Sequence, residues 1–424
     1  MALMFYEEAL SLVSAAAARR LLPDERIPLE FAIGRRIREN VRSREPQPSF
    51  DNSAMDGFAV RSVECSDSSV ILSVLESIAA GDRPMTLGSG TDSRECVEIM
   101  TGAPLPASFD GAPFDAVVKV EEVEVLEKSA DGRPRLIKIN RAVSSGENVR
   151  RAGEDFAAGA LLCQQGTVIH SQHLLALGAA GAGEVLVRRR PRVAVISTGN
   201  ELMEVSAAAL PKGTIRNSSA PFLIAALRDA GAEASYLGIV RDSEPEKLES
   251  MVQKLVKDGV IDVVITTGAV SMGRHDFIPD VLSRLGGQPV FHKTATRPGK
   301  PILFSTLGEQ GPLAWFGLPG NPVSTAVGFR FFVMPYLRAL MGSFPELPVR
   351  RVLNQPAKKP EGLRTFLLST LMAENRVDVI PAQASFKVSP LLRADSWVIL
   401  PEEGRSVSEG ESVAVLPFSA LIES

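Results

Sequence analysis

The chain has few of the residues from which disulfide frameworks and most transition-metal centres are built. Its 424 residues include 3 cysteines and 4 histidines. Cys65, Cys96 and Cys163 are far apart, and none has the Cys-x-x-Cys spacing. This pattern argues against a disulfide framework or a cysteine-histidine metal cluster, and it favours a reducing compartment. His170 and His173 could share a helix face, but we interpret them as surface or packing residues.

The sequence also lacks an excess of either charge and a long apolar run. Because 46 basic residues are balanced by 50 acidic ones, we expect neither nucleic acid nor an anionic membrane as a partner, and any anion site must be local. The first twenty residues, MALMFYEEALSLVSAAAARR, place the basic pair last and two glutamates early, which is the wrong order for a signal peptide. This apolar run is too short to cross a bilayer, so the segment is predicted to be an amphipathic helix of a cytoplasmic protein.

What is present is a multidomain pattern of strands and helices. The runs RVAVIST, AEASYLGIV and IDVVITT are apolar and β-branched and are separated by helical stretches. This alternation predicts βαβ units on a parallel-rich sheet covered on both faces, in residues 189–343. Residues 48–140 carry short strands with many turn signals and predict a β domain, and residues 344–424 predict a small β barrel or sandwich.

Two strands of the predicted parallel sheet end in the same way. Thr198-Gly199 is followed by Glu201, and a second Thr-Gly ending at Gly268 is followed by Asp276. Small residues at such strand ends free main-chain amides for phosphate, and a carboxylate beside phosphate requires a bridging cation, so Mg²⁺ is implied. The alternative is that both are turns that need small residues only for their geometry; the repetition favours a site.

Other polar residues are predicted to lie at the same edge of the sheet. Asp242 ends a third strand, although it or the next serine could simply cap the following helix. Arg297 and Lys300 are held on one Pro-Gly turn, as an oxyanion receptor requires. Asn321 and Ser324 lie in a second Pro/Gly loop that opens a helix. The residue types in both loops could be required by backbone angles alone. The density of such loops at one edge of the domain favours a functional site.

Two glycine patterns do not indicate nucleotide binding. GAAGAG at residues 178–183 reverses the order of the dinucleotide fingerprint and follows a predicted helix, so we interpret it as a helix stop and a turn. A P-loop sequence is absent, which argues against that class of NTPase. The turn-rich segments PSFDNSAMDGFAV and IMTGAPLP hold Asp56 and Thr101. These two residues become candidates for a functional site only if another domain faces them.

Taken together, the motifs resemble the molybdopterin molybdenumtransferase family, whose members include bacterial enzymes and the E domain of gephyrin. The resemblance covers essentially the whole chain and rests on PSFDNSAMDGFAV, IMTGAPLP, RRAGEDFAAG, STGNEL, GIVRD, GAVSMGRHD, RPGKP and LPGNPVS, in this order. It implies a discontinuous N-terminal domain of residues 1–47 and 141–188, an inserted β domain, a molybdopterin-binding α/β domain and a C-terminal small β barrel. It also implies an elongated homodimer whose active site lies between the α/β domain of one subunit and the β domain of the other.

The resemblance further implies the reaction and its residues. Molybdate would be joined to adenylylated molybdopterin with release of AMP, in the last step of molybdenum cofactor biosynthesis, between an upstream adenylyltransferase and downstream molybdoenzyme apoproteins. The implied catalytic residues are Asp56, Thr101, Glu201, Asp242 and Asp276, the last three also as Mg²⁺ ligands. The implied ligand-binding residues are Thr198, Gly199, Gly268, Ser271, Gly273, Arg297, Lys300, Pro319, Asn321, Ser324, Ser385 and Ser389, with the two C-terminal serines matched more loosely.

Some positions depart from the family pattern. Ala269 stands where the family usually has glycine, and its methyl group would strain a positive φ. Ser219 and Ser396 depart similarly, from asparagine and glycine. Two alternatives are a tungstate-specific paralogue and a gephyrin-like scaffold protein. Scaffolds of that type carry an extra N-terminal domain and a disordered linker, which this sequence does not show, so we expect an enzyme.

Overall fold

The structure is a computed structural model and describes residues 3–20, 22–67, 69–87, 94–108, 112–270, 276–308 and 313–419. The chain forms two compact units. Unit 1 comprises residues 1–25, 34–36 and 187–424, and unit 2 comprises residues 26–33 and 37–186. No helix in the described part of the chain is long and apolar enough to cross a membrane.

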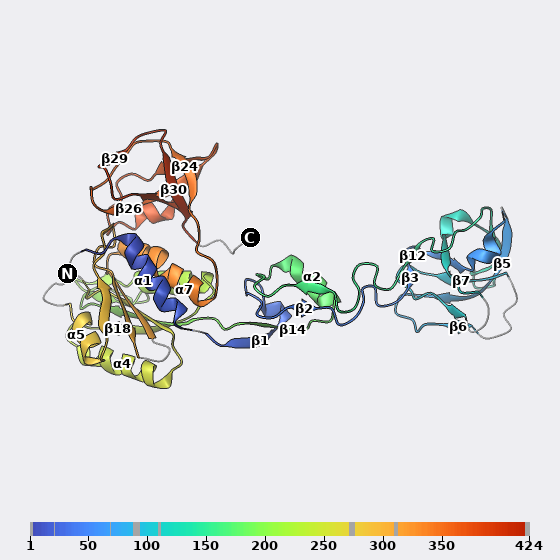
Figure 1. Cartoon of the computed structure of the whole chain (residues 1–424), viewed down its shortest axis with the longest axis horizontal. Helices are drawn as coiled ribbons and strands as arrows, with labels where there is room; N and C mark the ends of the chain where they lie inside the picture. Colours follow the sequence, from blue (N-terminus) through green and yellow to red (C-terminus); the bar gives the residue numbers. More distant parts are fainter. Residues whose placement is uncertain are drawn as a thin grey trace. The chain divides into compact units, whose positions relative to one another are not determined.

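The centre of unit 1 is a six-stranded sheet (Figure 1). In spatial order its strands are β18 (Glu233–Val240), β15 (Arg192–Thr198), β19 (Val263–Thr267), β23 (Leu313–Leu318), β22 (Leu303–Leu307) and β20 (Gln288–His292). The first four are parallel to one another, and β22 and β20 continue the sheet in antiparallel pairing. The predicted parallel-rich sheet is therefore present.

Both faces of this sheet are covered, as the unbroken apolar runs predict. Val193 and Val195 of β15 face one core, while Ala194 and Ile196 face the other. The helices that share the first core are α1 (Tyr6–Ala18), α3 (Ser219–Asp229), α6 (Pro322–Gly328) and α7 (Met334–Leu340). The second core is closed by α4 (Pro245–Asp258) and α5 (Ile278–Arg284) (Figure 1).

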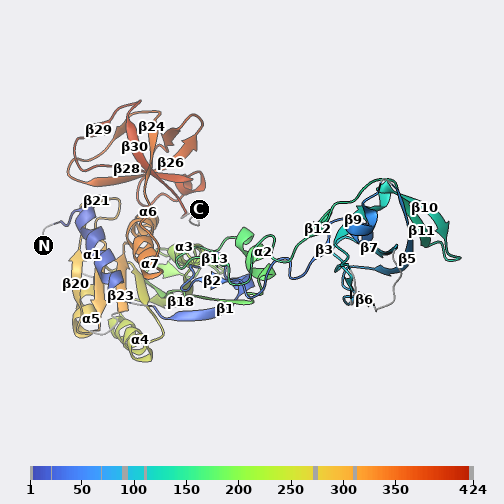
Figure 2. The same ribbon diagram turned by 45° about the vertical axis from the view of Figure 1, so that its right-hand side comes forward.

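The C-terminal region is a closed five-stranded barrel (Figure 2). Its strands are, in order, β26 (Arg364–Met372), β27 (Arg376–Val379), β24 (Val349–Leu353), β30 (Ser412–Pro417) and β28 (Ser396–Leu400). Because β28 also pairs with β26, the ring is complete, and the barrel rather than the sandwich is the correct alternative. The short strands β25 (Ala357–Lys358) and β29 (Ser406–Val407) and a 3-10 turn (Ser389–Leu392) complete this region.

Two features join the barrel to the sheet domain. The strand β21 (Thr296–Arg297) leaves the sheet domain and pairs with the start of β26, so the Pro-Gly turn that carries Lys300 lies beside the barrel. Aromatic rings form the second link. Phe331, in the π-helical turn between α6 and α7, stacks on Phe366 of β26 with ring centroids 3.8 Å apart.

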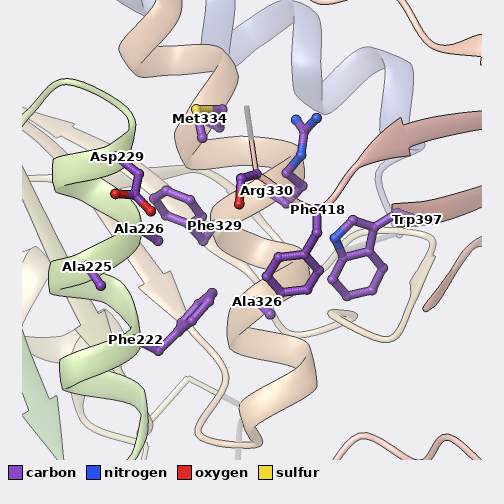
Figure 3. Close-up of a pocket in the computed structure, with 11 residues that line it drawn as sticks. Phe222, Ala225, Ala226, Asp229, Ala326, Phe329, Arg330, Met334, Trp397 and Phe418 are labelled. Carbon is purple, nitrogen blue, oxygen red and sulfur yellow. The ribbon is translucent and has the colours of Figure 1, made fainter. Parts of the chain in front are cut away.

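An apolar cavity of about 190 Å³ also lies at this junction (Figure 3). Its walls come from α3, from the α6–α7 segment and from the end of the barrel. Trp397 and Phe418 stack at one side, with ring centroids 5.5 Å apart, and Phe222 and Phe329 lie opposite (Figure 3). The cavity therefore lies within the packing between the helices of the sheet domain and the barrel.

Unit 2 is mainly β structure, as predicted. Its six-stranded sheet has the order β10 (Val123–Lys128), β11 (Pro134–Ile139), β5 (Val70–Ile78), β7 (Glu95–Ile99), β4 (Gly57–Val60) and β9 (Ala116–Lys119). Short strand pairs are β2 (Val41–Arg42) with β13 (Leu161–Cys163), β3 (Asn52–Ser53) with β12 (Val149–Arg150), and β6 (Thr86–Leu87) with β8 (Ala107–Ser108). The helix α2 (Ser171–Ala179) ends in the glycine segment that resembled a reversed fingerprint, which confirms its interpretation as a helix stop.

Two stretches show how single residues set the local structure. In the stretch RIPLEFAIG, β1 (Asp24–Pro28) stops at its proline and a 3-10 turn (Leu29–Phe31) follows. At the start of α3 the N-cap residue, Ser218, makes no side-chain cap; the side-chain oxygen of Asn217 accepts a hydrogen bond from the amide of Ala220 at 3.3 Å. The remaining short strands are β16 (Leu202–Met203) and β17 (Ile215–Arg216) of unit 1, and β14 (Glu184–Arg188), whose first three residues belong to unit 2 and last two to unit 1.

Candidate functional site

The carboxyl ends of β15 and β19 lie side by side and hold the two Thr-Gly turns against each other. The side-chain hydroxyl of Thr198 donates to the carbonyl of Thr267 at 3.0 Å. Gly268 has φ 93°, and a Cβ there would lie 2.5 Å from the carbonyl oxygen of Thr198 and 2.8 Å from its hydroxyl. No side chain fits at this position, so glycine is required by contact as well as by conformation.

These turns open into a pocket of about 450 Å³, which we call the strand-end pocket. Its lining is mostly small, rigid or uncharged. Two of its side chains are charged, Glu201 and Arg216. The described lining residues are Thr198, Glu201, Leu202, Ile215–Ser219, Thr267–Val270, Pro301, Pro319–Pro322 and Phe386.

A second pocket, of about 1010 Å³, lies between the Pro-Gly turn and the barrel, and we call it the basic pocket. Its four charged side chains are Arg297, Lys300, Lys358 and Lys359, and no aspartate or glutamate is among the described residues that line it. Lys359 is almost fully buried and donates to the main-chain carbonyls of residues 402 and 404, at 3.1 and 2.8 Å. Local positive charge is therefore concentrated in a chain whose net charge is -4, as the sequence requires of an anion site.

The two pockets adjoin. Pro301, Pro319, Asn321 and Phe386 line both of them. At this border the side-chain amide of Asn321 donates to the hydroxyl of Ser385 at 3.2 Å, and the loop of residues 383–386 is thereby tied to the loop that opens α6. One ligand with two unlike ends could occupy both pockets at once.

Most of the predicted site residues of unit 1 lie in these pockets. Thr198, Glu201 and Gly268 line the strand-end pocket, Arg297, Lys300, Ser324 and Ser385 line the basic pocket, and Pro319 and Asn321 line both. Gly199, Asp242, Asp276 and Ser389 are described but line neither pocket. Ser271 and Gly273 lie outside the described residues.

The three predicted magnesium ligands are not assembled into a metal site. Among the described residues, no group of three histidine, cysteine, aspartate or glutamate side chains is placed to hold a metal ion. Glu201 faces the strand-end pocket, whereas Asp242 and Asp276 do not line it. The protein alone does not provide the three-carboxylate set, so oxygen atoms of a ligand would have to complete it.

Asp242 holds the loop that follows β15. It does not cap α4, whose N-cap residue is Glu244. Its carboxylate accepts the amide of Asn200 at 3.3 Å, while its own amide donates to the side-chain oxygen of Asn200 at 3.1 Å. The reading of Asp242 as a simple helix cap is therefore wrong; it ties two strand ends together.

Asn217 is a pocket residue that the motif analysis did not single out. Its side-chain amide donates to the hydroxyls of Ser197 and Tyr236, at 2.9 and 3.0 Å, and the Tyr236 hydroxyl donates to Glu204 at 2.9 Å. Burial and the carboxylate of Glu204 raise the pKa of Tyr236 to about 12. This network holds the side chain of Asn217 at the strand-end pocket, and the only signal for it in the sequence was an asparagine just before a helix.

In unit 2 the structure brings together the two site residues, Asp56 and Thr101, that the resemblance implied there. The amide and the hydroxyl of Thr101 both donate to one carboxylate oxygen of Asp56, at 2.7 and 2.8 Å. The backbone hydrogen bond from Thr101, helped by that from its hydroxyl, lowers the pKa of Asp56. Asp51 is instead committed to Arg151, at 2.6 Å, and to the amide of Ala152, at 2.8 Å. Asp56 is therefore an ionised carboxylate on an exposed loop.

Comparison with known proteins shows what the chain is related to. It is 38% identical over 417 residues to the molybdopterin molybdenumtransferase of Synechococcus elongatus, covering 97% of this chain and 99% of the relative. The chain belongs to the molybdopterin molybdenumtransferase family. The family enzymes of Bacillus subtilis and Haemophilus influenzae are 33% and 34% identical, over 92% and 94% of this chain and 89% and 95% of their own. This membership places the chain in molybdenum cofactor biosynthesis.

Family models and a solved structure agree with this assignment. Residues 4–181 match the MoeA N-terminal region (domain I and II), residues 194–339 match a "Probable molybdopterin binding domain", and residues 350–418 match the MoeA C-terminal region (domain IV). The crystal structure of a MoeA protein from Pyrococcus horikoshii aligns with a TM-score of 0.79 at 31% identity, over 99% of this chain and 100% of its own. The predicted multidomain fold class is confirmed.

Proposed function

We propose that this molybdopterin molybdenumtransferase joins molybdate to adenylylated molybdopterin, releases AMP and leaves molybdenum on the dithiolene. The observation that carries the proposal is the pair of adjoining pockets with different charge. One pocket is lined by four cations and no carboxylate among the described residues, and the other is formed by Thr-Gly turns with one carboxylate, Glu201, and one cation, Arg216. A substrate with a phosphoanhydride and an incoming oxyanion needs both environments next to each other.

In this proposal the basic pocket receives the oxyanion. Arg297 offers a planar fork of donors and Lys300 a compact ammonium group, and both face the same pocket. Each charge-assisted hydrogen bond to a dianion is worth about 1.5–3 kcal/mol. Ser324, Ser385 and Asn321 add neutral donors at the border.

The strand-end pocket is proposed to hold the phosphate-bearing end of the pterin substrate. Gly268 keeps the wall free of side chains, and Thr198 and Thr267, the last residues of β15 and β19, line the pocket there. Glu201 at the edge of this pocket would share Mg²⁺ with phosphate oxygens. Asp242 and Asp276, from the loops that follow β18 and β19, would contribute to the same ion. When bound, that ion would neutralise charge on the phosphoanhydride.

We further propose a cytoplasmic homodimer in which Asp56 and Thr101 of one subunit complete the site of the other. Its substrate would come from an adenylyltransferase and its product would go to molybdoenzyme apoproteins. Asp56→Ala and Asp276→Ala subunits should each be inactive alone. A heterodimer of the two keeps both aspartates in one of its two sites, so it should recover about half of the wild-type activity. A monomer by light scattering, or no recovery in verified heterodimers, would count against the composite site.

The reaction is tested by incubating the purified protein with adenylylated molybdopterin and Mg²⁺ and following AMP with and without molybdate. The proposal predicts AMP release that depends on molybdate. A parallel reaction with tungstate decides which oxyanion is preferred, because both are tetrahedral dianions of similar size. Release at the same rate without any oxyanion, or no release at all, would overturn the proposal.

A further inference from the structure

Arg241 makes an unusual set of contacts at the end of β18. A single nitrogen of its guanidinium, Nη1, lies 3.3, 2.8 and 2.7 Å from the main-chain carbonyl oxygens of Gly199, Asn200 and Leu202. These three residues surround Glu201 in the loop that follows β15. A charged donor therefore gathers the carbonyl groups on both sides of Glu201, and charge-assisted bonds of this kind are the stronger ones in proteins.

The same loop is held from two other directions. The carbonyl of Glu201 accepts the amide of Ile215 at 2.8 Å, and Asn200 exchanges two hydrogen bonds with Asp242. Gly199 leaves room for the Glu201 carboxylate, because a Cβ at Gly199 would lie 2.6 and 2.8 Å from its two oxygens. The main chain that carries Glu201 is thus held from three directions, and Gly199 leaves space for its carboxylate.

We propose that Arg241 is a positioning residue, which fixes the 199–202 loop so that Glu201 faces the strand-end pocket. This inference rests on the proposed function, because it assigns Arg241 to the same site. Arg241 does not touch that site directly. It is not among the described residues that line the strand-end pocket, and the depression that it does line holds Met203, Glu204 and Lys247.

The hydrogen bonds of Arg241 predict the effect of each substitution at this position. Arg241→Met removes the donor from three carbonyl groups; Asn200 is exposed and Leu202 half-buried, so water can replace the donor there, whereas Gly199 is buried. The fold is kept, but the loop moves, and a misplaced group at a reaction centre costs about ten- to a hundredfold in rate. Arg241→Lys keeps one nitrogen with three hydrogens, so it restores part of the loss. Arg338, which donates to the carbonyl of Phe344 away from both pockets, gives the matched control Arg338→Met.

The first test is hydrogen exchange of residues 199–204 in the ligand-free full-length protein. Arg241→Met should exchange these amides at least about tenfold faster than the wild type, with Arg241→Lys between them and Arg338→Met unchanged. This readout needs no activity, so it stands even if the wild type releases no AMP, an outcome that would overturn only the proposed function. Unchanged exchange in Arg241→Met overturns the positioning role.

The second test asks whether Arg241 acts through Glu201. Arg241→Met should lower kcat for molybdate-dependent AMP release by at least about tenfold in the wild-type background but by less than about threefold in Glu201→Gln. A merely structural role would lower the unfolding temperature and leave kcat per folded molecule unchanged. Equal losses in the two backgrounds would show that Arg241 does not act through Glu201 and would contradict the proposal.

Discussion

The two ends of the same parallel sheet use their carboxylates in opposite ways. At the amino end, Asp262 precedes β19 and is 1% exposed. It accepts hydrogen bonds from Arg20 at 2.6 Å, from Arg189 at 3.0 Å and from the amide of Arg192 at 2.7 Å. At the carboxyl end, Glu201 is exposed beside small residues and a pocket.

The difference separates a structural charge from a functional one. Burial by itself would raise the pKa of Asp262, but the hydrogen bonds from Arg189, the Arg192 amide and Arg20 outweigh it and lower the pKa. A carboxylate saturated in this way has no bonding capacity left for a ligand and joins α1 to the sheet domain. In open α/β sheets ligands bind outside the carboxyl ends of the strands, where Glu201 lies.

The largest effect is expected at the carboxyl end. Asp276→Ala should lower molybdate-dependent AMP release by about a thousandfold or more, equivalent to roughly 4 kcal/mol, because a carboxylate beyond the small-residue loop is proposed to share Mg²⁺ with phosphate. The exposed Asp280, in the first turn of α5, supplies the control Asp280→Ala. Steady-state kinetics and thermal unfolding check the pair. Wild-type turnover in a well-folded Asp276→Ala protein would remove Asp276 from the site.

The opposite result is expected at the amino end. Asp262→Asn should lower the free energy of unfolding by about 3 kcal/mol, because it leaves the half-buried Arg20 and Arg189 without their buried carboxylate while the amide oxygen keeps some acceptor capacity. Turnover per folded molecule should not change. Urea unfolding and active-site kinetics on the same preparation measure both quantities.

The lowered pKa of Asp262 determines how the stability difference between wild type and Asp262→Asn should change with pH. The folded pKa of Asp262 is lowered, so its contribution is fully present above the unfolded value near 3.8 and is lost as the pH falls through the folded pKa. The difference in stability between wild type and Asp262→Asn should therefore shrink as the pH falls below about 4. A difference that grows on acidification would show that the carboxylate is not stabilised as described.

A third and smaller effect distinguishes the two pockets. Lys300→Ala should weaken molybdate binding by roughly tenfold, if at least about 1.4 kcal/mol of charge-assisted bonding is lost. The same substitution should change binding of adenylylated molybdopterin much less. The exposed Lys254 on α4 provides the control Lys254→Ala. Titration of AMP release with molybdate measures the effect on molybdate binding, and calorimetry measures the effect on nucleotide binding. If nucleotide affinity collapses while the molybdate dependence is unchanged, the pockets have been assigned the wrong way round.

The smallest effect concerns a departure from the family pattern. Ala269 has φ 52°, in the left-handed region, as its place in a family glycine position led us to expect. Ala269→Gly should stabilise the protein by about 1 kcal/mol, because the backbone strain of a Cβ in this region is removed. Chemical unfolding measures the change. A loss of stability of the same size would mean that packing of the methyl group outweighs the strain.

The sequence predicted the sheet well because burial on both faces leaves an unbroken signal. The run of residues 193–196 is apolar at every position, and its alternate side chains enter two different cores. The resemblance named Asp56 and Thr101 as site residues but did not predict their contact, because 45 residues separate them in the sequence.

Positions defined by long-range main-chain contacts could not be predicted. Arg241 is one arginine after a strand, and its acceptors are carbonyl groups 39 to 42 residues away that carry no residue-type signature. Asn217 likewise depends on hydroxyls from two separate strands. The predicted magnesium set illustrates the same limit, because three carboxylates at strand ends need not converge.

The most direct test of the division between the two ends is a hydrogen-exchange footprint of adenylylated molybdopterin on the wild-type protein. We expect slower exchange at residues 198–203 and 317–325, which border the strand-end pocket, and no change at residues 189–193 and 260–263 around Asp262. Protection confined to the amino end of the sheet, with none at the strand-end pocket, would contradict the account.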